Sequence, residues 1–515
     1  MKRTCACNGV FLIMLVNMAL AQSVAGLESL VDRLEHPLWT ARRDAALAIA
    51  ASGPAASNAI PALTRTLDDV DVQVRRAAVQ ALADVGVGSE AALPGLVHAL
   101  SDHDWVVRRR AALSFEDMPA GDAVADIRGL LASESMDVRT SAALALSGLA
   151  PESLDALPEL VAALAAGDWQ LRAAAAHALG ALGPDGREAL PALARALRDR
   201  DWGVAEQVVE ALSLIGEAAL PVLIEALSDT SIAVRWGAVR ALGRIGANAE
   251  AAVPAIAGLL DDAVIQARWA AARSLWAIGP AAAGAAPELI TALDDPDWVV
   301  RWSSARALGA TAAEPHLDAT VTALAAALED RDSRVCEAAA FSLEQLGTAA
   351  IDALPALGRA ATGAADWTDE NSESPACQVI DVGPAAEKLL MQSGWTVRWA
   401  AVRALGVVGR GETSALASLR LATLDEQWQV RGIAALAIGQ FENRATPPAV
   451  AAIAAALSDE HAAVRKAATI ALGEIGPTAR TALAALRRAT EDEDDAVREA
   501  AVVAIAKVSA NSQGE

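Results

Sequence analysis

The sequence predicts an all-α fold, an α-α superhelix (a HEAT-like solenoid) of about fourteen two-helix units. One motif recurs through most of the 515 residues, mostly at a spacing of 33, a period typical of stacked helical arrays. Hydrophobic residues make up 54% of the chain but aromatic residues only 3%, because Ala and Leu, both good helix formers, dominate. A chain of this length also exceeds the roughly 250–300 residues that one compact core can hold, whereas stacked repeats pack only on their neighbours.

The repeated unit is seen most clearly at Asp294–Gly309, which reads DDPDWVVRWSSARALG. An acidic turn leads to an apolar residue, usually Val, followed by Arg, and small residues then continue at helical spacing to Ala-Leu-Gly. We call the apolar residue before the Arg the anchor of its unit. The fourteen anchors are Ala41, Val74, Val107, Val138, Leu171, Val204, Val234, Ala267, Val300, Val335, Val397, Val430, Val464 and Val497.

Each unit is predicted to contain two antiparallel helices. The first helix starts near an Asp three residues before the anchor, whose carboxylate suits an N-cap, and it ends at a Gly that supplies a left-handed residue. The second helix begins at Ala-Leu-Pro, because Pro is favoured in a first helical turn. Such prolines are Pro94, Pro158, Pro191, Pro221, Pro254, Pro287 and Pro355.

The first 21 residues have the three parts of a secretory signal peptide: basic Lys2 and Arg3, an apolar core over Val10–Leu20, and a small-residue end. We expect cleavage after Ala21, an exported protein in the periplasm or outside the cell, and no stable membrane span in the mature chain. An uncleaved anchor is the alternative, although the apolar run is shorter than the roughly 20 residues that a span needs. The net charge of −23 argues against a nucleic-acid partner.

The turn–Val-Arg–x-x-Ala–x-x-Ala-Leu-Gly pattern, with Leu-Pro-x-Leu opening the second helix, resembles the HEAT-like repeats first associated with phycobilisome lyases. The resemblance covers about residues 27–510 and implies a binding scaffold more often than an enzyme, since fold does not decide function. Two related families carry chemistry, bilin lyases and deoxyhypusine hydroxylases. The hydroxylases bind their metal through His-Glu pairs, and none of the six His here precedes a Glu.

The anchor spacing predicts the division of the chain. Between Val335 and Val397 it is 62 residues, and the polar, acidic segment 365–383 stands there in place of a first helix. We interpret this segment as an irregular loop that replaces part of a repeat, either a docking insert or a decayed unit without a role. The predicted parts are a signal peptide (1–21), an N-terminal array (22–364), the loop (365–383), a C-terminal array (384–510) and a disordered tail (511–515).

The Arg after the anchor recurs in twelve of the fourteen units. One Arg and one Asp in each unit predict a structural ladder of Arg–carboxylate contacts along the turns, because the guanidinium fork suits two acceptors. The predicted ladder contains Arg42, Arg75, Arg108, Arg139, Arg172, Arg235, Arg268, Arg301, Arg398, Arg431, Arg465 and Arg498.

Eleven of the thirteen Trp residues occupy two positions of the unit, which lie four residues apart and therefore share one helix face. We expect the position after the Arg to be at least partly exposed, because Arg, Lys and Glu occupy it in other units. Either these Trp plug the joints between units, or they form a ridge that binds a protein segment, as Trp and Arg do at interaction hot spots. The candidate ridge is Trp236, Trp269, Trp302, Trp298 and Trp399, with Arg235, Arg268 and Arg301.

Residues for catalysis or metal binding are sparse. No two His have metal-ligand spacing, and no catalytic residue, metal or cofactor is predicted. After signal cleavage Cys336 and Cys377 remain, and in an oxidising compartment they are a candidate disulfide. The sequence therefore favours an exported, non-enzymatic scaffold with a protein partner. The alternatives are a lyase-type or hydroxylase-type protein, or a Trp row that binds carbohydrate or another small ligand.

Overall fold

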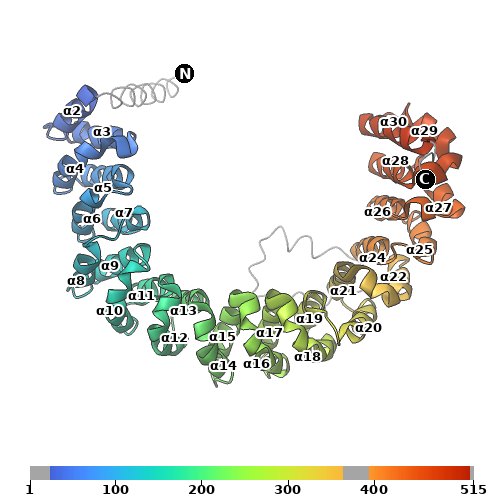
Figure 1. Cartoon of the computed structure of the whole chain (residues 1–515), viewed down its shortest axis with the longest axis horizontal. Coiled ribbons are helices and arrows are strands. Elements are labelled where there is room, and N and C mark those ends of the chain that lie inside the picture. The colour runs from blue at the N-terminus through green and yellow to red at the C-terminus, as the bar shows by residue number, and fades with distance from the viewer. Residues whose placement is uncertain (1–23, 364–393, 511–515) are drawn as a thin grey trace. The chain divides into compact units, whose positions relative to one another are not determined.

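The computed structural model describes residues 24–363 and 394–510. The chain divides into two compact units, residues 1–241 and 242–515, and the division falls within α15 (Ile232–Ile245). Over the described residues all regular structure is helical, with α-helices joined by short 3-10 helices (Figure 1). The predicted all-α class is confirmed, and each of the fourteen anchors lies in a first helix.

In unit 1, successive first helices pack on one another in one layer, and the shorter second helices form the other layer (Figure 1). Its first helices are α3 (Trp39–Ala50), α5 (Val72–Gly86), α7 (Trp105–Ser114), α9 (Met136–Gly148), α11 (Trp169–Ala181) and α13 (Trp202–Ile215), followed by α15. Its second helices are α2 (Val24–Arg33), α4 (Ile60–Thr66), α6 (Leu93–Ala99), α8 (Ala123–Leu130), α10 (Leu157–Ala163), α12 (Leu190–Ala196) and α14 (Leu220–Ala226). Its 3-10 helices are η1 (Gly53–Ala59), η2 (Glu90–Ala92), η3 (Phe115–Asp117), η4 (Glu152–Ala156), η5 (Gly183–Ala189) and η6 (Gly216–Ala219).

Unit 2 has the same two layers. Its first helices are α17 (Ile265–Ile278), α19 (Trp298–Thr311), α21 (Ser333–Leu346), α24 (Trp395–Val408), α26 (Trp428–Gly439), α28 (Ala462–Ile475) and α30 (Asp495–Ser509). Its second helices are α16 (Val253–Gly258), α18 (Ala286–Thr291), α20 (Leu317–Ala327), α22 (Leu354–Ala361), α25 (Ala415–Ala422), α27 (Pro447–Ala456) and α29 (Leu483–Ala489). Its 3-10 helices are η7 (Gly246–Ala252), η8 (Leu259–Asp261), η9 (Gly279–Ala285), η10 (Ala292–Asp294), η11 (Gly347–Ala353), η13 (Glu442–Arg444) and η14 (Gly476–Ala482).

The helix ends follow the predicted local chemistry. Asp104 caps α7 by accepting from the backbone N–H groups of Val106 and Val107, and Asp168 and Asp201 cap α11 and α13 in the same way. The predicted prolines stand in the first turn of their second helices. The Gly at the helix end differs from the prediction: Gly279 has φ +71° and ψ −140°, which is not the left-handed helical region but a region that only Gly adopts readily.

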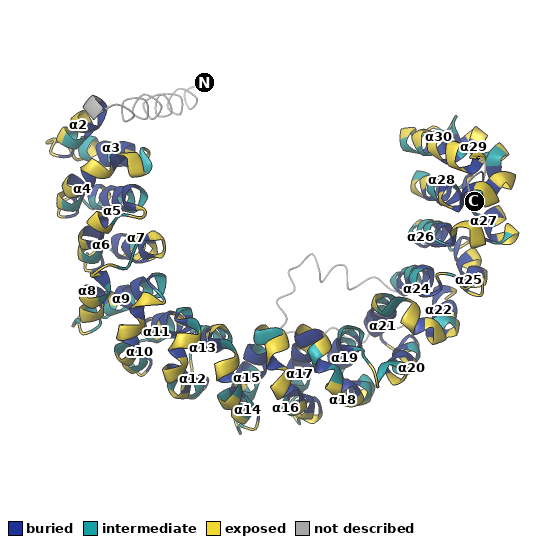
Figure 2. Cartoon of the chain, in the orientation of Figure 1, coloured by how far each residue is buried: buried dark blue, intermediate teal, exposed yellow. Residues whose placement is uncertain are grey.

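The core lies between the two layers and consists mainly of the Ala and Leu side chains of the repeats (Figure 2). First helices approach one another closely where the Gly of Ala-Leu-Gly faces an Ala. A Cβ on Gly180 would lie 2.6 Å from the Ala211 Cα, so no larger residue fits between α11 and α13. The only apolar stretch long enough to span a membrane in the described residues, Trp202–Ala226, is α13 and α14 with a 3-10 turn between them.

Helix α24 packs directly on α21, and α25 packs on α22. The units on either side of the long anchor spacing are therefore neighbours, as any two consecutive units are. Segment 365–383, interpreted above as an irregular loop that replaces part of a repeat, falls between α22 and α24 in the sequence. The segment itself, the signal peptide and the tail lie outside the described residues, and their assignments stay predictions.

Candidate functional site

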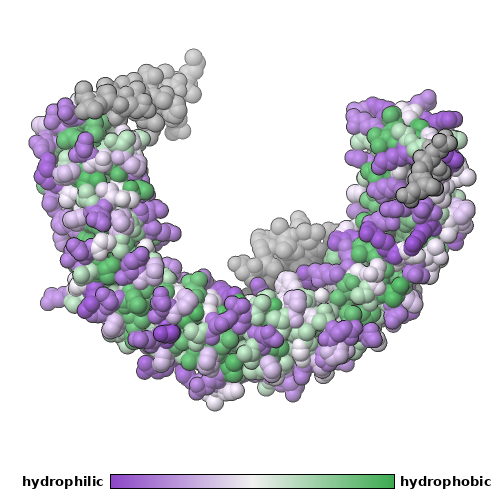
Figure 3. Space-filling model, viewed as in Figure 1, coloured by the Kyte–Doolittle hydropathy of each residue, from purple (hydrophilic) through white to green (hydrophobic). Residues whose placement is uncertain are grey.

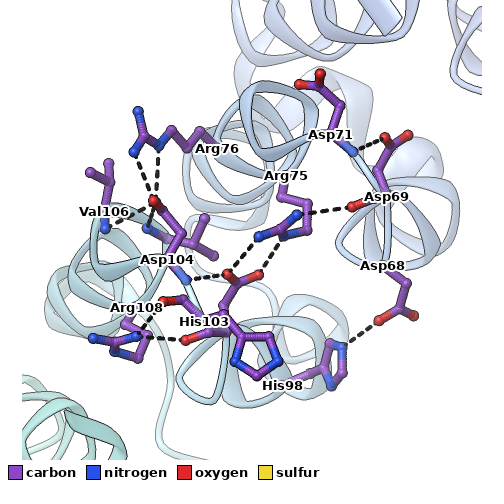
Figure 4. Close-up of polar contacts among 12 residues, drawn as sticks. Asp68, Asp69, Asp71, Arg75, Arg76, His98, His103, Asp104, Val106 and Arg108 are labelled. Carbon is purple, nitrogen blue, oxygen red and sulfur yellow. Dashed lines mark hydrogen bonds and ion pairs between the residues drawn. The ribbon is translucent and has the colours of Figure 1, made fainter.

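An Arg–Asp contact joins most units to the next at the turns before the first helices. Arg75 on α5 donates from Nε and Nη2 to the two carboxylate oxygens of Asp102, at 2.8 and 3.1 Å, and from Nη1 to the carbonyl oxygen of Asp69 at 3.1 Å (Figure 4). Asp102 also accepts from the backbone N–H of Asp104 at 2.7 Å. One guanidinium therefore ties the turn of its own unit to the turn of the following unit.

The same bidentate contact recurs in both units. The pairs are Arg42–Asp69, Arg75–Asp102, Arg172–Asp199, Arg268–Asp295, Arg301–Asp330, Arg398–Asp425, Arg431–Asp459 and Arg465–Asp492. The hydrogen bonds from Arg172 hold the pKa of the Asp199 carboxyl below its ordinary value, although burial opposes the shift. The bond to Asp199 in turn raises the pKa of Arg172. These Arg residues hold the array together and are not free to bind a ligand.

Four of the predicted ladder positions differ from this geometry. Arg108 binds Asp137, four residues after Ser133, which occupies the usual partner position. Arg139 has no carboxylate partner, and its Nη1 and Nη2 donate to the Ser133 carbonyl oxygen and the Met136 sulfur. Arg235 donates to the carbonyl oxygen of Asp229 at 2.8 Å. Arg498, at the end of the array, pairs with Asp495 of its own helix.

The expectation that the position after the Arg is exposed is wrong for Trp269, and Trp298, the ridge member at the other Trp position, is buried as well. Trp269 is 4% exposed and Trp298 is 6% exposed. The rings lie under the long side chains of Arg residues, with the Arg334 guanidinium 3.4 Å from the centre of the Trp298 ring and that of Arg273 5.6 Å from Trp269. An Arg stem covers apolar surface while its charge stays near water, so an Arg-rich face need not leave its Trp residues accessible.

The other three ridge residues are half-buried. Trp236 lies under Arg240, and Trp399 meets Phe341 edge-on with ring centres 6.2 Å apart. Trp236 belongs to unit 1 whereas Trp269 and Trp302 belong to unit 2, so a continuous row of the three stays a prediction. Of their Arg neighbours, Arg268 and Arg301 are engaged by Asp295 and Asp330.

Exposed Trp residues do occur in unit 1, at the position two residues before the anchor. Trp105 is 63% exposed and Trp202 is 69% exposed, and Trp39 and Trp169 are exposed as well. In the two units between them the same position holds Val72 and Met136. We call these six residues, at one position of six consecutive first helices, the exposed Trp row: Trp39, Val72, Trp105, Met136, Trp169 and Trp202.

The sequence shows this position as clearly as the other Trp position, but it does not show which of the two faces solvent. Each residue of the exposed Trp row opens its helix next to the turn, but this place alone does not expose a ring, since Trp298 opens α19 and is buried. Figure 3 shows hydrophilic and hydrophobic residues interspersed over the visible face of unit 1. That mixture is typical of a binding surface that stays soluble when unoccupied.

The described residues contain no group of three or more His, Cys, Asp or Glu side chains that could hold a metal ion. Cys336 is a fully buried free thiol that donates to the Asp330 carbonyl oxygen at 3.2 Å, and burial raises its pKa above the ordinary value. Cys377 lies outside the described residues, so the Cys336–Cys377 disulfide stays a prediction. Peptide mapping of the exported protein without reduction would decide it.

Paired helices that repeat in two layers and are joined by a regular turn contact define an α-solenoid. A family model for HEAT repeats matches residues 27–116, 94–180, 157–229, 217–276, 253–344, 286–372 and 419–506. The chain belongs to the HEAT-repeat family. No curated protein matches the sequence. The phycobilisome-lyase type of repeat stays a prediction.

Solved structures with a similar fold include importin beta and Kap121p. Importin beta is 16% identical with a TM-score of 0.54, and the match covers 94% of this chain and 72% of importin beta. Kap121p bound to Pho4p is 13% identical with a TM-score of 0.62, covering 93% of this chain and 56% of Kap121p. Kap121p bound to Nup53p is 13% identical with a TM-score of 0.61, and the match has the same coverage. The chain thus spans little more than half of Kap121p, and at these identities the likeness shows the fold alone.

Proposed function

We propose that this protein is an exported, non-enzymatic HEAT-repeat scaffold whose unit 1 binds a protein partner through the exposed Trp row. The observation that carries the proposal is the exposure of four Trp residues at one repeated position of six consecutive first helices. A side chain as apolar as Trp is seldom left so accessible, and neighbouring exposed apolar residues mark interaction sites.

The repeat supplies the geometry that such a site needs. Consecutive first helices in one layer pack about 8–10 Å apart, so the exposed Trp row presents its side chains at regular intervals along the layer. Each ring offers a large apolar area and has few rotatable bonds to order on binding. This arrangement fits an extended protein segment better than a single small ligand.

Two further observations support a binding role. The Arg–Asp contacts bind the units to each other, which leaves the exposed Trp row as the repeated feature accessible to a partner. The structural neighbours include Kap121p bound to Pho4p and Kap121p bound to Nup53p, which are HEAT-type solenoids holding proteins. We extend that mode of action to this chain as part of the proposal.

The test is cross-linked affinity capture from the exporting cell, with the chain from residue 22 as bait. Wild type is compared with the triple variant Trp105→Ala, Trp169→Ala, Trp202→Ala. We expect the triple variant to lose the partner, because truncation of a Trp hot spot costs about 2 kcal/mol or more of binding free energy. The matched control is Trp276→Ala, which removes an exposed Trp of α17 outside the row. Equal recovery of the partner by all three proteins would contradict the proposal.

Export is the second part of the proposal and has its own test. It rests on the signal-peptide pattern of the first 21 residues. N-terminal sequencing of the exported fraction should begin at or close to Gln22. A cytosolic product that retains Met1 would overturn the proposed compartment and leave the partner surface to be tested separately.

A further inference from the structure

A pocket of about 840 Å³ lies beside the turn between α10 and α11 in unit 1. Small side chains line much of it, including Ala163 and Ala166, and α8, α9 and α10 contribute Arg128, Arg139 and Glu159. None of the six residues of the exposed Trp row lines the pocket, although Met136 of the row contacts Arg139.

The pocket lies at a joint where the Arg–Asp contact of the ladder is missing; below, each such contact is called a rung. At six of the eight regular joints the carboxylate lies 27 residues after the Arg, as in the pair Arg172–Asp199. The residue 27 positions after Arg139 is Ala166. The side chain that would bind the Arg139 guanidinium is therefore truncated to a methyl group, and Ala166 lies in the wall of the pocket.

Arg139 is left with an unused donor. Its Nη1 donates to the Ser133 carbonyl oxygen and its Nη2 to the Met136 sulfur, both at 3.1 Å, but its Nε is buried and has no hydrogen-bond partner. A thioether is a weak acceptor, so the guanidinium lacks the anionic partner that eight other ladder Arg residues bind through Nε and Nη2. Leaving a buried charged donor without a partner is costly.

An unused acceptor lies in the same pocket. The Oε1 atom of Glu159 accepts from Arg128 Nε at 2.9 Å, whereas its Oε2 atom is buried and has no partner. A ligand that satisfies both groups must carry an acceptor for Arg139 and an N–H or O–H donor for Glu159. The negative charge of Glu159 also disfavours a dianion such as phosphate and favours a ligand of single negative charge.

We propose that this pocket binds a carboxylate that carries a neighbouring hydrogen-bond donor, with the carboxylate in the place of the missing Asp side chain. The regular joints show the geometry: Arg172 donates to Asp199 from Nε at 2.6 Å and from Nη2 at 2.8 Å. Two sources present this chemistry, a small hydroxy acid and the free C-terminus of a peptide, whose last amide N–H lies beside its carboxylate.

The experiment measures binding to the full exported chain with four probes. L-lactate is compared with propionate, which lacks the hydroxyl, and acetyl-trialanine with a free C-terminus is compared with its amide. The readout is the methyl resonance of Met136 in protein labelled at the methionine methyl groups, assigned with Met136→Leu, because this side chain contacts Arg139. Met118, which lies outside the pocket lining, is the internal control.

We expect L-lactate, the free-acid peptide or both to shift the Met136 resonance, and propionate and the peptide amide to bind at least about tenfold more weakly, as for a lost hydrogen bond to a charged group. Ala166→Asp restores the rung and should abolish binding while raising the melting temperature. Arg139→Gln should abolish binding without that stabilisation. Glu159→Gln should keep carboxylate binding and lose the preference for L-lactate over propionate.

Which probe binds distinguishes the two sources of the carboxylate. The inference is overturned if no probe shifts Met136 at millimolar concentration, or if Ala166→Asp and Arg139→Gln bind as wild type does. Circular dichroism of each variant separates loss of binding from loss of folding. Because Trp105, Trp169 and Trp202 are unchanged in these variants, failure here leaves the proposed partner surface untouched.

Discussion

A Trp is not exposed or covered by its position in the unit alone: Trp298 and Trp202 share one position, yet Trp298 is buried beneath Arg334. Trp269 is buried beneath Arg273, whereas Trp202 opens α13 and stays exposed. Helical spacing shows correctly that the two positions share a face. It cannot show how far the neighbouring side chains cover each ring, because that depends on the rotamers of long Arg stems and on the next unit.

This difference predicts opposite effects on stability. Trp269→Ala should destabilise unit 2 by about 3–5 kcal/mol, because it removes a large buried side chain. Trp202→Ala should change stability by less than about 0.5 kcal/mol, since an exposed ring has few contacts to lose. Urea unfolding followed by circular dichroism measures both. A small effect at Trp269 would show that its ring is accessible in solution and would restore the ridge to consideration.

At the scale of the element, the ladder is the feature that the sequence predicts best. Because an Arg and an Asp recur at a fixed spacing, the sequence leaves little choice of which residues pair. The N-cap Asp and the first-turn Pro are also predictable, since both depend only on nearby residues of the same helix. The same spacing places Arg498 as the last Arg of the predicted ladder. The spacing does not predict that Arg108 binds Asp137. That contact depends on how far the side chains reach across a joint where Ser133 replaces the usual Asp.

Loss of the Arg at a regular Arg–Asp contact should reduce stability more than loss of Arg139, which has no carboxylate partner. Arg465→Ala removes two bonds to Asp492 and one to the Asp459 carbonyl oxygen, and we expect a local loss of about 2–4 kcal/mol. The matched control, Arg139→Ala, removes no bond to a carboxylate and should cost about 1 kcal/mol or less. Hydrogen exchange is the suitable measurement, because a repeat opens together with its neighbours and not with the whole chain. Equal loss of protection at both joints would contradict a stabilising role for the carboxylates.

The ladder also makes stability depend on pH. The Arg172 hydrogen bonds lower the pKa of Asp199, and those of Arg465 lower the pKa of Asp492. A carboxyl whose folded pKa lies below its unfolded value, about 4, stabilises the fold fully above that value and loses the effect as the pH falls through the folded pKa. The melting temperature should therefore fall steeply below pH about 4.

The control for this prediction is the double variant Asp199→Asn, Asp492→Asn, whose melting temperature should be lower at pH 7 and should depend less on pH. An unchanged dependence in the variant would show that other carboxyls control the acid transition. The Arg partners do not contribute to this slope, since their pKa values are raised further above the range concerned.

At the scale of the whole molecule, the sequence predicts the repeated architecture but not the continuity of packing around residues 364–393. A spacing of 62 residues suggests a lost first helix if every residue is assigned to a unit. The contacts of α21 with α24 and of α22 with α25 show that the described helices on either side stack as consecutive units do. Whether residues 364–393 are a docking insert or a decayed repeat stays a prediction, because both leave the same gap between anchors.

Removing the insertion is therefore predicted to preserve the fold. Replacing residues 364–393 with a turn copied from Leu67–Asp71, which joins α4 to α5, should keep the helical circular dichroism signal and change the melting temperature by only a few degrees. A variant that deletes α24 and α25 as well is the control and should unfold part of unit 2. Loss of helix in the first variant would show that the insertion carries part of the core.

The ladder also gives the array a direction. At the eight regular joints the guanidinium reaches forward along the chain, so each of these joints has one donor side and one acceptor side, whereas Arg498 pairs with Asp495 of its own helix. If a module were added after α30 with an Asp at the ladder position of its turn, Arg498 could donate to that Asp. Growth by duplication of whole 33-residue periods keeps donor and acceptor matched, whereas insertion of a partial period inside a unit does not. The array can thus become longer or shorter by whole modules while the Arg–Asp contact at each joint stays the same.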